Sequence, residues 1–222
     1  RQMTVPKSLL GFQQDKKPDD ALKLTVRDIP DDYLTARAAY ICPMDLVTQT
    51  QLIAGLKRGS VHSFILDPSP ATMTPTSRRE LPALLNGVTA FLPSEEAMRN
   101  LFQAETHDLW EMAEAVSLYG CEYVVIKRGM HGQFLYDAES KRKWEIPAYP
   151  SRVEDVTGAG DAFGGGFVSG LCKDYDPLEG VLRGNVSASL MLEGQDTFHP
   201  LDVLPGLAEA RLNALRDMVR KV

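Results

Sequence analysis

The chain has 222 residues, of which 44% are hydrophobic and 24% are charged, a composition typical of a globular protein that can bury one sizeable core. Its formal net charge at pH 7 is -6. An acidic chain lacks the basic surface that binding to nucleic acid or to an anionic membrane requires. We therefore expect neither as a partner.

The apolar runs and the cysteines indicate the cellular compartment of the protein. No apolar run approaches the ~20 residues of a membrane-spanning helix, and no signal-peptide core opens the chain. The three cysteines, Cys42, Cys121 and Cys172, are odd in number and widely spaced, which is typical of free thiols in a reducing compartment. The four histidines show no zinc-ligand spacing. We expect a cytoplasmic protein.

Short apolar segments alternate with longer segments of helical period, and this alternation predicts a parallel sheet with crossover helices. The segments are nearly continuously apolar, as strands buried on both faces are. The predicted strands are residues 38–41, 61–66, 88–92 and 123–126. The fold class is therefore α/β.

Helices are predicted between these strands, at residues 45–56, 94–102 and 108–119. The second begins at Ser94, whose hydroxyl can accept hydrogen bonds from the first amides of a helix. The third places its apolar residues on one face and is followed by Gly120. These helices are suited to be the crossovers of the sheet.

The pattern changes after the fourth strand. Residues 133–136 and 143–146, separated by a polar turn, predict an antiparallel hairpin attached to the parallel sheet. A glycine-rich stretch follows the hairpin. Helices are then predicted at residues 162–171, 178–192 and 207–219.

The glycine-rich stretch, DVTGAGDAFGGGF at residues 155–167, has three interpretations. Glycines can serve backbone geometry alone, through positive φ or close helix packing. Gly158, Gly160 and Gly164 also form a variant of the dinucleotide fingerprint, which would make the protein an NAD(P) oxidoreductase. That fingerprint should follow directly on a buried strand early in the chain, whereas a polar, proline-containing segment precedes this one.

The third interpretation is an anion site at the N-terminus of a helix. The first amides of a helix lack internal partners and carry the positive end of the helix dipole. Small residues let this backbone approach a phosphoryl group, and Asp161 would stand where a substrate hydroxyl meets it. As a general base, Asp161 would take the proton of the attacking alcohol while the amides stabilise the transferring group. This chemistry favours a kinase acting on a hydroxyl.

The stretch at residues 155–171 resembles, nearly residue for residue, the C-terminal signature of the ribokinase-like, or PfkB, family of carbohydrate kinases. The resemblance implies a three-layer αβα fold with a mostly parallel sheet. It also implies that Asp161 is the catalytic base and that the backbone of Gly158, Ala159 and Gly160 forms the anion hole.

Residues 124–137 are similar to the family's strand-turn-hairpin segment. The resemblance implies that Lys127, Gly129 and Gly132 line the nucleotide site. From the residues alone, Lys127 could equally be a solvated strand end and Gly129 a turn residue, because glycine is common in turns for steric reasons.

The resemblance implies two further ligand contacts. Residues 183–194 are similar to the family's adenine-side helix, with Asn185 as the predicted base or ribose contact, although a local hydrogen bond explains an asparagine equally well. Asp155 and the carbonyl of Thr157 resemble the monovalent-cation site, for K⁺, that many members carry beside the anion hole.

The chain departs from the family at residues 93–98, PSEEAM. The family's Asn-x-x-Glu segment, tied to Mg²⁺ and phosphate positioning, would place Ser94 at the Asn position and Ala97 at the Glu position. Glu95 and Glu96 lie one or two residues early, and a displaced carboxylate can still act on Mg²⁺ through a water. Their alternative role is to place negative charge in the first turn of a helix.

The resemblance covers the C-terminal three-quarters, and the family's first strands, glycine motif and lid are not seen. We expect residues 1–222 to form a single ribokinase-like core domain. A lid would come from the unseen part or from another subunit, as in a homodimer. Asp67, after the second predicted strand, lies where ligands bind in such sheets, although a proline-rich loop without function explains this segment as well.

The sequence therefore predicts an ATP-dependent kinase that phosphorylates a hydroxyl of a sugar or sugar-like small molecule, with Mg²⁺ bridging the ATP phosphates. A non-catalytic nucleotide- or sugar-binding homologue is the alternative, because the acidic segment around Ser94 is altered. An NAD(P) oxidoreductase is the second alternative.

Overall fold

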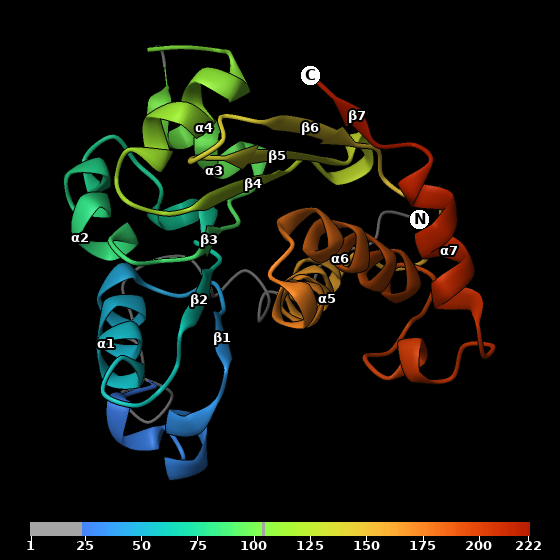
Figure 1. Cartoon of the computed structure of the whole chain (residues 1–222), viewed down its shortest axis with the longest axis horizontal. Helices are drawn as coiled ribbons and strands as arrows, with labels where there is room; N and C mark the ends of the chain where they lie inside the picture. The colour runs from blue at the N-terminus through green and yellow to red at the C-terminus, as the bar shows by residue number, and fades with distance from the viewer. Residues whose placement is uncertain (1–23, 104) are drawn as a thin grey trace, which may run out of the picture.

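A computed structural model of the chain describes residues 24–103 and 105–222 (Figure 1). The predicted core domain of residues 1–222 also includes residues 1–23, which lie outside this range. Seven strands of the described part form one sheet in chain order. The parallel strands are β1 (Ala38–Ile41), β2 (Ser63–Leu66), β3 (Ala90–Phe91) and β4 (Tyr123–Lys127). All four lie within or beside the predicted segments.

The sheet continues with antiparallel strands, which are β5 (Gln133–Asp137), β6 (Lys143–Ile146) and β7 (Arg220–Lys221). The predicted hairpin is confirmed as β5 and β6, with Leu135 opposite Trp144. Strand β7 was not predicted, because its two charged residues carry no apolar alternation. It pairs with β6 at the edge of the sheet.

Helices cover both faces of the sheet (Figure 1). On one face lie α1 (Leu46–Leu56), α2 (Leu81–Leu85), α3 (Glu95–Phe102) and α4 (Leu109–Ser117); on the other lie α5 (Ala159–Asp174), α6 (Pro177–Met191) and α7 (Leu207–Arg216). Short 3-10 helices lie at Val26–Asp28, Asp31–Thr35, Pro70–Thr72, Ser77–Arg79, Gly129–His131 and His199–Leu201. The five-residue α2 was not predicted.

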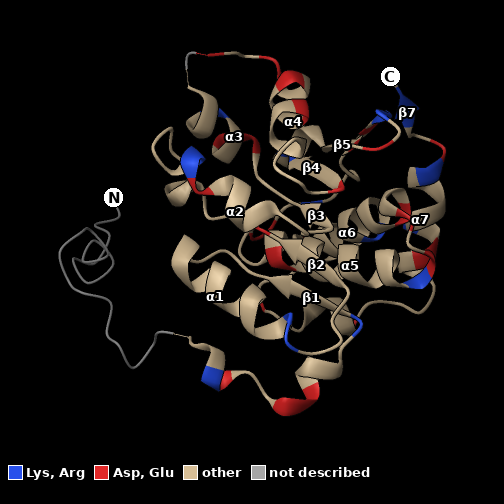
Figure 2. Cartoon of the chain, turned by 60° about the vertical axis from the view of Figure 1, so that its left-hand side comes forward, with Lys and Arg blue, Asp and Glu red and all other residues tan. Residues whose placement is uncertain are grey.

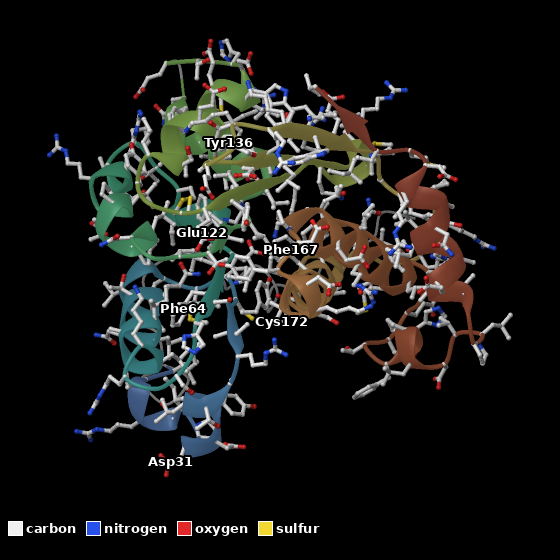
Figure 3. The ribbon with its side chains drawn as sticks, in the orientation of Figure 1. Asp31, Phe64, Glu122, Tyr136, Phe167 and Cys172 are labelled. Atoms are coloured by element: carbon white, nitrogen blue, oxygen red, sulfur yellow. The ribbon has the colours of Figure 1, made fainter. Side chains whose placement is uncertain are left out.

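Two hydrophobic cores lie on opposite faces of the sheet. Successive strand residues point to opposite faces, so Phe64 and Leu66 join the core beneath α1 to α4, whereas Ile65 joins the core beneath α5 to α7. Figure 3 labels residues of both cores, among them Phe64 on β2 and Phe167 on α5. The predicted three-layer αβα fold is thereby confirmed.

Polar caps begin the helices where the sequence predicts them. The Asp45 carboxylate accepts from the Thr48 amide at 2.9 Å at the start of α1, and the Ser94 hydroxyl accepts from the Ala97 amide at 3.1 Å at the start of α3. Each cap satisfies an amide that has no partner inside the helix. These contacts fix where each crossover leaves the carboxyl end of its strand.

Charged residues lie mainly on the outer helices and connections (Figure 2). The central strands β2 and β3 contain none. All three cysteines are free thiols, and burial raises the pKa of Cys121 to about 12. Within residues 24–103 and 105–222, no helix has the length and apolarity to cross a bilayer.

Two glycines of α5 lie against neighbouring elements without room for a side chain. A Cβ atom at Gly164 would lie 2.1 Å from Cζ of Tyr40 in β1, and one at Gly166 would lie 2.6 Å from the carbonyl oxygen of Arg183 in α6. Neither position can hold a side chain without moving a backbone element or an aromatic ring. Close packing of α5 on β1 and α6 therefore requires these glycines.

We expect Gly164→Ala to lower the free energy of unfolding by about 1 to 3 kcal/mol, because the added methyl group overlaps the Tyr40 ring. The matched control is Gly165→Ala, because no heavy atom lies within 4 Å of a Cβ placed there. This control should raise stability by about 0.5 to 1 kcal/mol, since alanine is the better helix former. Urea unfolding measures both changes, and equal effects would contradict the close contact.

Candidate active site

The candidate site lies at the carboxyl ends of the parallel strands, where open α/β sheets bind their ligands. Asp67 directly follows β2, and Lys127 is the last residue of β4. Gln49 of α1 is fully buried and donates through Nε2 to the carbonyls of Cys42 at 2.8 Å and Asp67 at 2.7 Å. This amide holds the ends of β1 and β2 together.

Asp67, Lys127 and Tyr40 form a polar cluster at this edge. The Asp67 side chain is only 3% exposed, and its Oδ2 accepts from the Lys127 amine in an ion pair and from the Tyr40 hydroxyl at 2.9 Å. Burial raises the pKa of the Asp67 carboxyl, although Lys127 and Tyr40 favour its charged form. The pKa of Tyr40 is also raised, first by burial and then by Asp67, so its hydroxyl remains a donor.

The first turn of α5 meets the same edge. Gly158 precedes the helix with φ of 77°, a left-handed conformation that favours glycine, and no side chain from the described residues caps the amides. Asp161 is exposed in this turn. Its negative charge contributes to the raised pKa values of Tyr40, Cys42 and Asp67, after burial in each case. Asp161 therefore lies within electrostatic range of the polar cluster.

The five glycines of this stretch serve different purposes. Gly158 has positive φ, while Gly164 and Gly166 allow close packing. Gly165 has open space beside it. A Cβ at Gly160 would have only one neighbour within 4 Å, the Lys127 amine at 3.9 Å. Backbone conformation and packing thus account for Gly158, Gly164 and Gly166. Gly160 leaves the first amides of α5 open to a ligand, beside the Lys127 amine.

A cavity of about 610 Å³ extends from this first turn toward the β5–β6 hairpin. Lys127, Gly129, Ala159 and Gly160, all predicted to be site residues, line it. Its remaining lining is mainly apolar and is made by Met130, Gln133, Ala148, Tyr149, Pro150, Ser151, Val153, Val156, Phe163, Ala188 and Leu192. Such a cavity, apolar with a few polar groups at one end, has the character of a small-molecule site.

Asn185 lies behind the wall of this cavity and is only 3% exposed. Its Nδ2 donates to the Gln133 side chain at 2.8 Å and to the Pro147 carbonyl at 2.7 Å, and its Oδ1 accepts from the Tyr149 amide at 3.0 Å. In the structure Asn185 joins α6 to two segments that line the cavity. The predicted contact with a nucleotide stays a prediction.

The two predicted turn glycines differ in their surroundings. Gly129 has φ of 54° and open space beside it, whereas Gly132 has φ of 80° and a Cβ there would lie 2.0 Å from the carbonyl oxygen of Ile146. Gly132 is thus needed for packing against β6. Gly129 is the one of the two that lines the cavity.

The predicted ion-binding residues are Asp155, before α5, and the neighbours Glu95 and Glu96 in the first turn of α3. Asp155 accepts from the Thr157 amide at 2.9 Å, which lowers the pKa of its carboxyl. Glu95 accepts from the Arg99 side chain at 2.6 Å, and Glu96 is exposed. Among the described residues, no three or more His, Cys, Asp or Glu side chains form a group that could hold a metal ion. The assignments of Asp155, Glu95 and Glu96 to ions stay predictions.

Sequence reasoning did not identify Tyr40 or the apolar lining of the cavity. Tyr40 was assigned only to a strand, and its contact with Asp67 joins residues 27 positions apart. The one available signal was a single hydroxyl-bearing side chain in a strand of otherwise apolar residues. Val153 and Val156, exposed at 57% and 70%, gave no periodic signal because their segment forms no helix or strand.

The chain belongs to a known class of enzymes. The family model described as pfkB family carbohydrate kinase matches residues 34–203, which is more than half of the chain. The chain therefore belongs to the pfkB family of carbohydrate kinases. The dinucleotide interpretation is wrong, because no strand directly precedes the glycine-rich turn and the family is one of kinases.

Curated relatives agree with this family. The chain is 31% identical over 163 residues to a cytidine kinase of Thermococcus kodakarensis, which covers 73% of this chain and 57% of the relative. It is 27% identical over 175 residues to a ribokinase of Staphylococcus aureus, covering 74% of this chain and 55% of the relative. The chain thus spans little more than half the length of these relatives.

Solved structures share the fold. Arabidopsis thaliana ribokinase, complexed with ribose and ATP, matches 85% of this chain and 60% of its own with a TM-score of 0.64 at 20% identity. Phosphofructokinase-2 from Escherichia coli, in complex with substrates and products, matches 86% of this chain and 60% of its own with a TM-score of 0.65 at 18% identity. At these identities the likeness establishes the ribokinase-like fold.

We expect Asn185→Ala to lower the free energy of unfolding by about 2 to 4 kcal/mol, because buried partners would lose their hydrogen bonds. The control is Asn213→Ala, which removes an exposed side chain whose one hydrogen bond within the described part of the chain is accepted from Arg216. Chemical unfolding measures the effect. If Asn185→Ala keeps its stability and only weakens ATP binding, Asn185 acts on the nucleotide and not on the fold.

Proposed function

We propose that this protein transfers the γ-phosphoryl group of ATP to a hydroxyl of a sugar or sugar-like small molecule. The observation that carries the proposal is the exposed carboxylate of Asp161 in the first turn of α5, whose amides no described side chain caps. A carboxylate beside an anion site serves as a base better than as a ligand for phosphate. Membership of the family supports the same chemistry.

In the proposed reaction Asp161 takes the proton of the acceptor hydroxyl. The hydroxyl oxygen forms a bond to the γ-phosphorus, and the bond from that phosphorus to the oxygen of ADP breaks. The amides of residues 158–161 stabilise the negative charge on the transferring group. The rest of the nucleotide would occupy the apolar cavity beside Val156 and Gly160.

The described residues fit Mg²⁺ that is carried by the ATP phosphates. Glu95 is engaged by Arg99 and Arg128, whereas Glu96 is exposed and has neither a hydrogen bond nor an ion pair among residues 24–103 and 105–222. Mg²⁺ commonly keeps several waters and takes one or two carboxylates, so Glu96 would hold it through water. When bound, Mg²⁺ would neutralise phosphate charge. Asp155 and the Thr157 carbonyl would hold K⁺ at the other side of the turn.

A non-catalytic nucleotide-binding protein is the second candidate. The observation in its favour is the acidic segment at the start of α3, where Ala97 is fully buried and Glu95 is neutralised by two arginines. Such a protein would bind ATP but phosphorylate no acceptor. Turnover by the protein therefore separates the two candidates.

The remaining parts of the proposal concern the whole protein. We propose that the chain forms one core domain and that the lid over the acceptor comes from a part of the fold outside these residues or from the partner in a homodimer. Closure would exclude water from the reacting phosphoryl group. Light scattering with and without ATP would measure the molar mass in solution and so show whether the protein is a homodimer.

The direct test measures ATP consumption with a panel of pentoses, hexoses, their phosphates and nucleosides. Nucleosides and pentoses come first, because the relatives are a cytidine kinase and a ribokinase. Turnover of one acceptor above the ATPase background supports the kinase. ATP binding by calorimetry without turnover of any acceptor would leave the non-catalytic candidate.

With the best acceptor, we expect Asp161→Asn to lower kcat by about 10²- to 10⁴-fold, which is the usual contribution of a general base. The control is Asp174→Asn, an exposed aspartate at the far end of the same helix, whose kcat should stay that of the wild type. Steady-state kinetics at saturating ATP measures both. An Asp161→Asn variant as fast as the wild type would refute the base assignment.

A further inference from the structure

The Lys127 amine lies between a buried carboxylate and the first turn of α5. On one side it forms an ion pair with Asp67, whose side chain is only 3% exposed. On the other side it would lie 3.9 Å from a Cβ placed at Gly160. Among the described residues that line the cavity, Lys127 is the one cationic side chain. Its position is therefore suited to an anionic ligand at the amides of α5.

Asp67 is itself held from two directions. The Tyr40 hydroxyl donates to Oδ2 of Asp67 at 2.9 Å, and the same oxygen accepts from the Lys127 amine. The backbone carbonyl of Asp67 accepts from the buried side chain of Gln49 at 2.7 Å. A lysine has a flexible four-carbon stem and loses much rotamer freedom when its amine is fixed. Because the anchored Asp67 carboxylate already holds the Lys127 amine, this rotamer freedom is lost before a ligand binds and does not weaken ligand binding.

Tyr40 connects this anchor to the helix that carries Asp161. Its ring packs on Gly164, where no side chain fits. Residues three apart lie on the same face of a helix, so Asp161 and Gly164 share the face of α5 that meets β1. The positions of the proposed base, the tyrosine and the ion pair are therefore set by one packing contact.

The charge of Asp67 depends on Lys127. Burial raises the pKa of Asp67, and the attraction of Lys127 opposes this shift. Without the amine, a buried carboxyl tends to take up a proton and lose its charge. The lysine thus favours the charged form of Asp67, and the ion pair with Asp67 holds the lysine amine in place.

We propose that Asp67 and Tyr40 are positioning residues, which hold the Lys127 amine toward the phosphate chain of ATP at the anion site. The inference rests on the proposed function and extends it, since it assigns a role to two residues outside the glycine-rich stretch. The Lys127 amine also supplies positive charge near the first turn of α5.

The first test compares ATP with adenosine by calorimetry, using the full chain. We expect Lys127→Met to weaken ATP binding by about tenfold or more, because a charge-assisted hydrogen bond is lost. Adenosine lacks phosphates, so its affinity should stay that of the wild type. Loss of affinity for both ligands to the same degree would show a purely structural role for Lys127 and would overturn the inference.

The second test is a double-mutant cycle with Asp67→Asn, a nearly isosteric change. If Asp67 acts through Lys127, Asp67→Asn should change ATP affinity by about threefold or more in the wild-type background and have little effect in Lys127→Met. The double variant carries neither charge, so no buried ion is left unpaired. Equal effects of Asp67→Asn in both backgrounds would refute the positioning role.

Tyr40→Phe removes only the hydroxyl and should shift ATP affinity in the same direction as Asp67→Asn, by a smaller factor. The control is Lys143→Met, which breaks a comparable ion pair with Glu114, 2.7 Å long and outside the cavity lining. It should leave ATP affinity unchanged. If the wild-type chain binds no ATP, the proposed function fails together with this inference. If the wild type binds ATP and Lys127→Met binds it equally well, only this inference fails.

Discussion

The contact between Gly164 of α5 and the Tyr40 ring of β1 is the constraint on which the candidate site depends. A Cβ at position 164 would overlap the ring, so the helix reaches the sheet only with glycine there. A helix moves as a stiff rod, and any shift at this contact would displace its first turn. The contact of Gly164 with Tyr40, one turn further along α5, thus sets the positions of Asp161 and of the amides around Gly160.

The direction of the parallel strands determines which polar groups can meet. β2 and β4 end at the same edge of the sheet, and this brings Asp67 and Lys127 together although they are 60 residues apart. The net charge of the chain is -6, so an anionic ligand needs local positive potential. The uncapped first turn of α5 and the amine of Lys127 both supply it at this edge.

Much of the fold could be predicted because its signals are local. Continuous apolar runs indicated β1 to β4, and the Ser94 side chain indicated where α3 begins. Strand β7 could not be predicted, because its stability comes from pairing with β6 and not from its own residues. The hydrogen-bond partners of Asn185 could not be predicted either. Its three hydrogen bonds reach Gln133, Pro147 and Tyr149, which lie in a different part of the chain.

The sequence by itself determined the fold class, the family and the residues of the glycine-rich turn, because each depends on local pattern or on a contiguous motif. Only the tertiary structure decided which glycines serve packing and which leave the turn open, since that depends on Tyr40 and α6. It also decided that Lys127 pairs with Asp67 and that Glu95 pairs with arginines. Contacts between distant residues depend on how strands and helices are placed in space, and no local pattern records that placement.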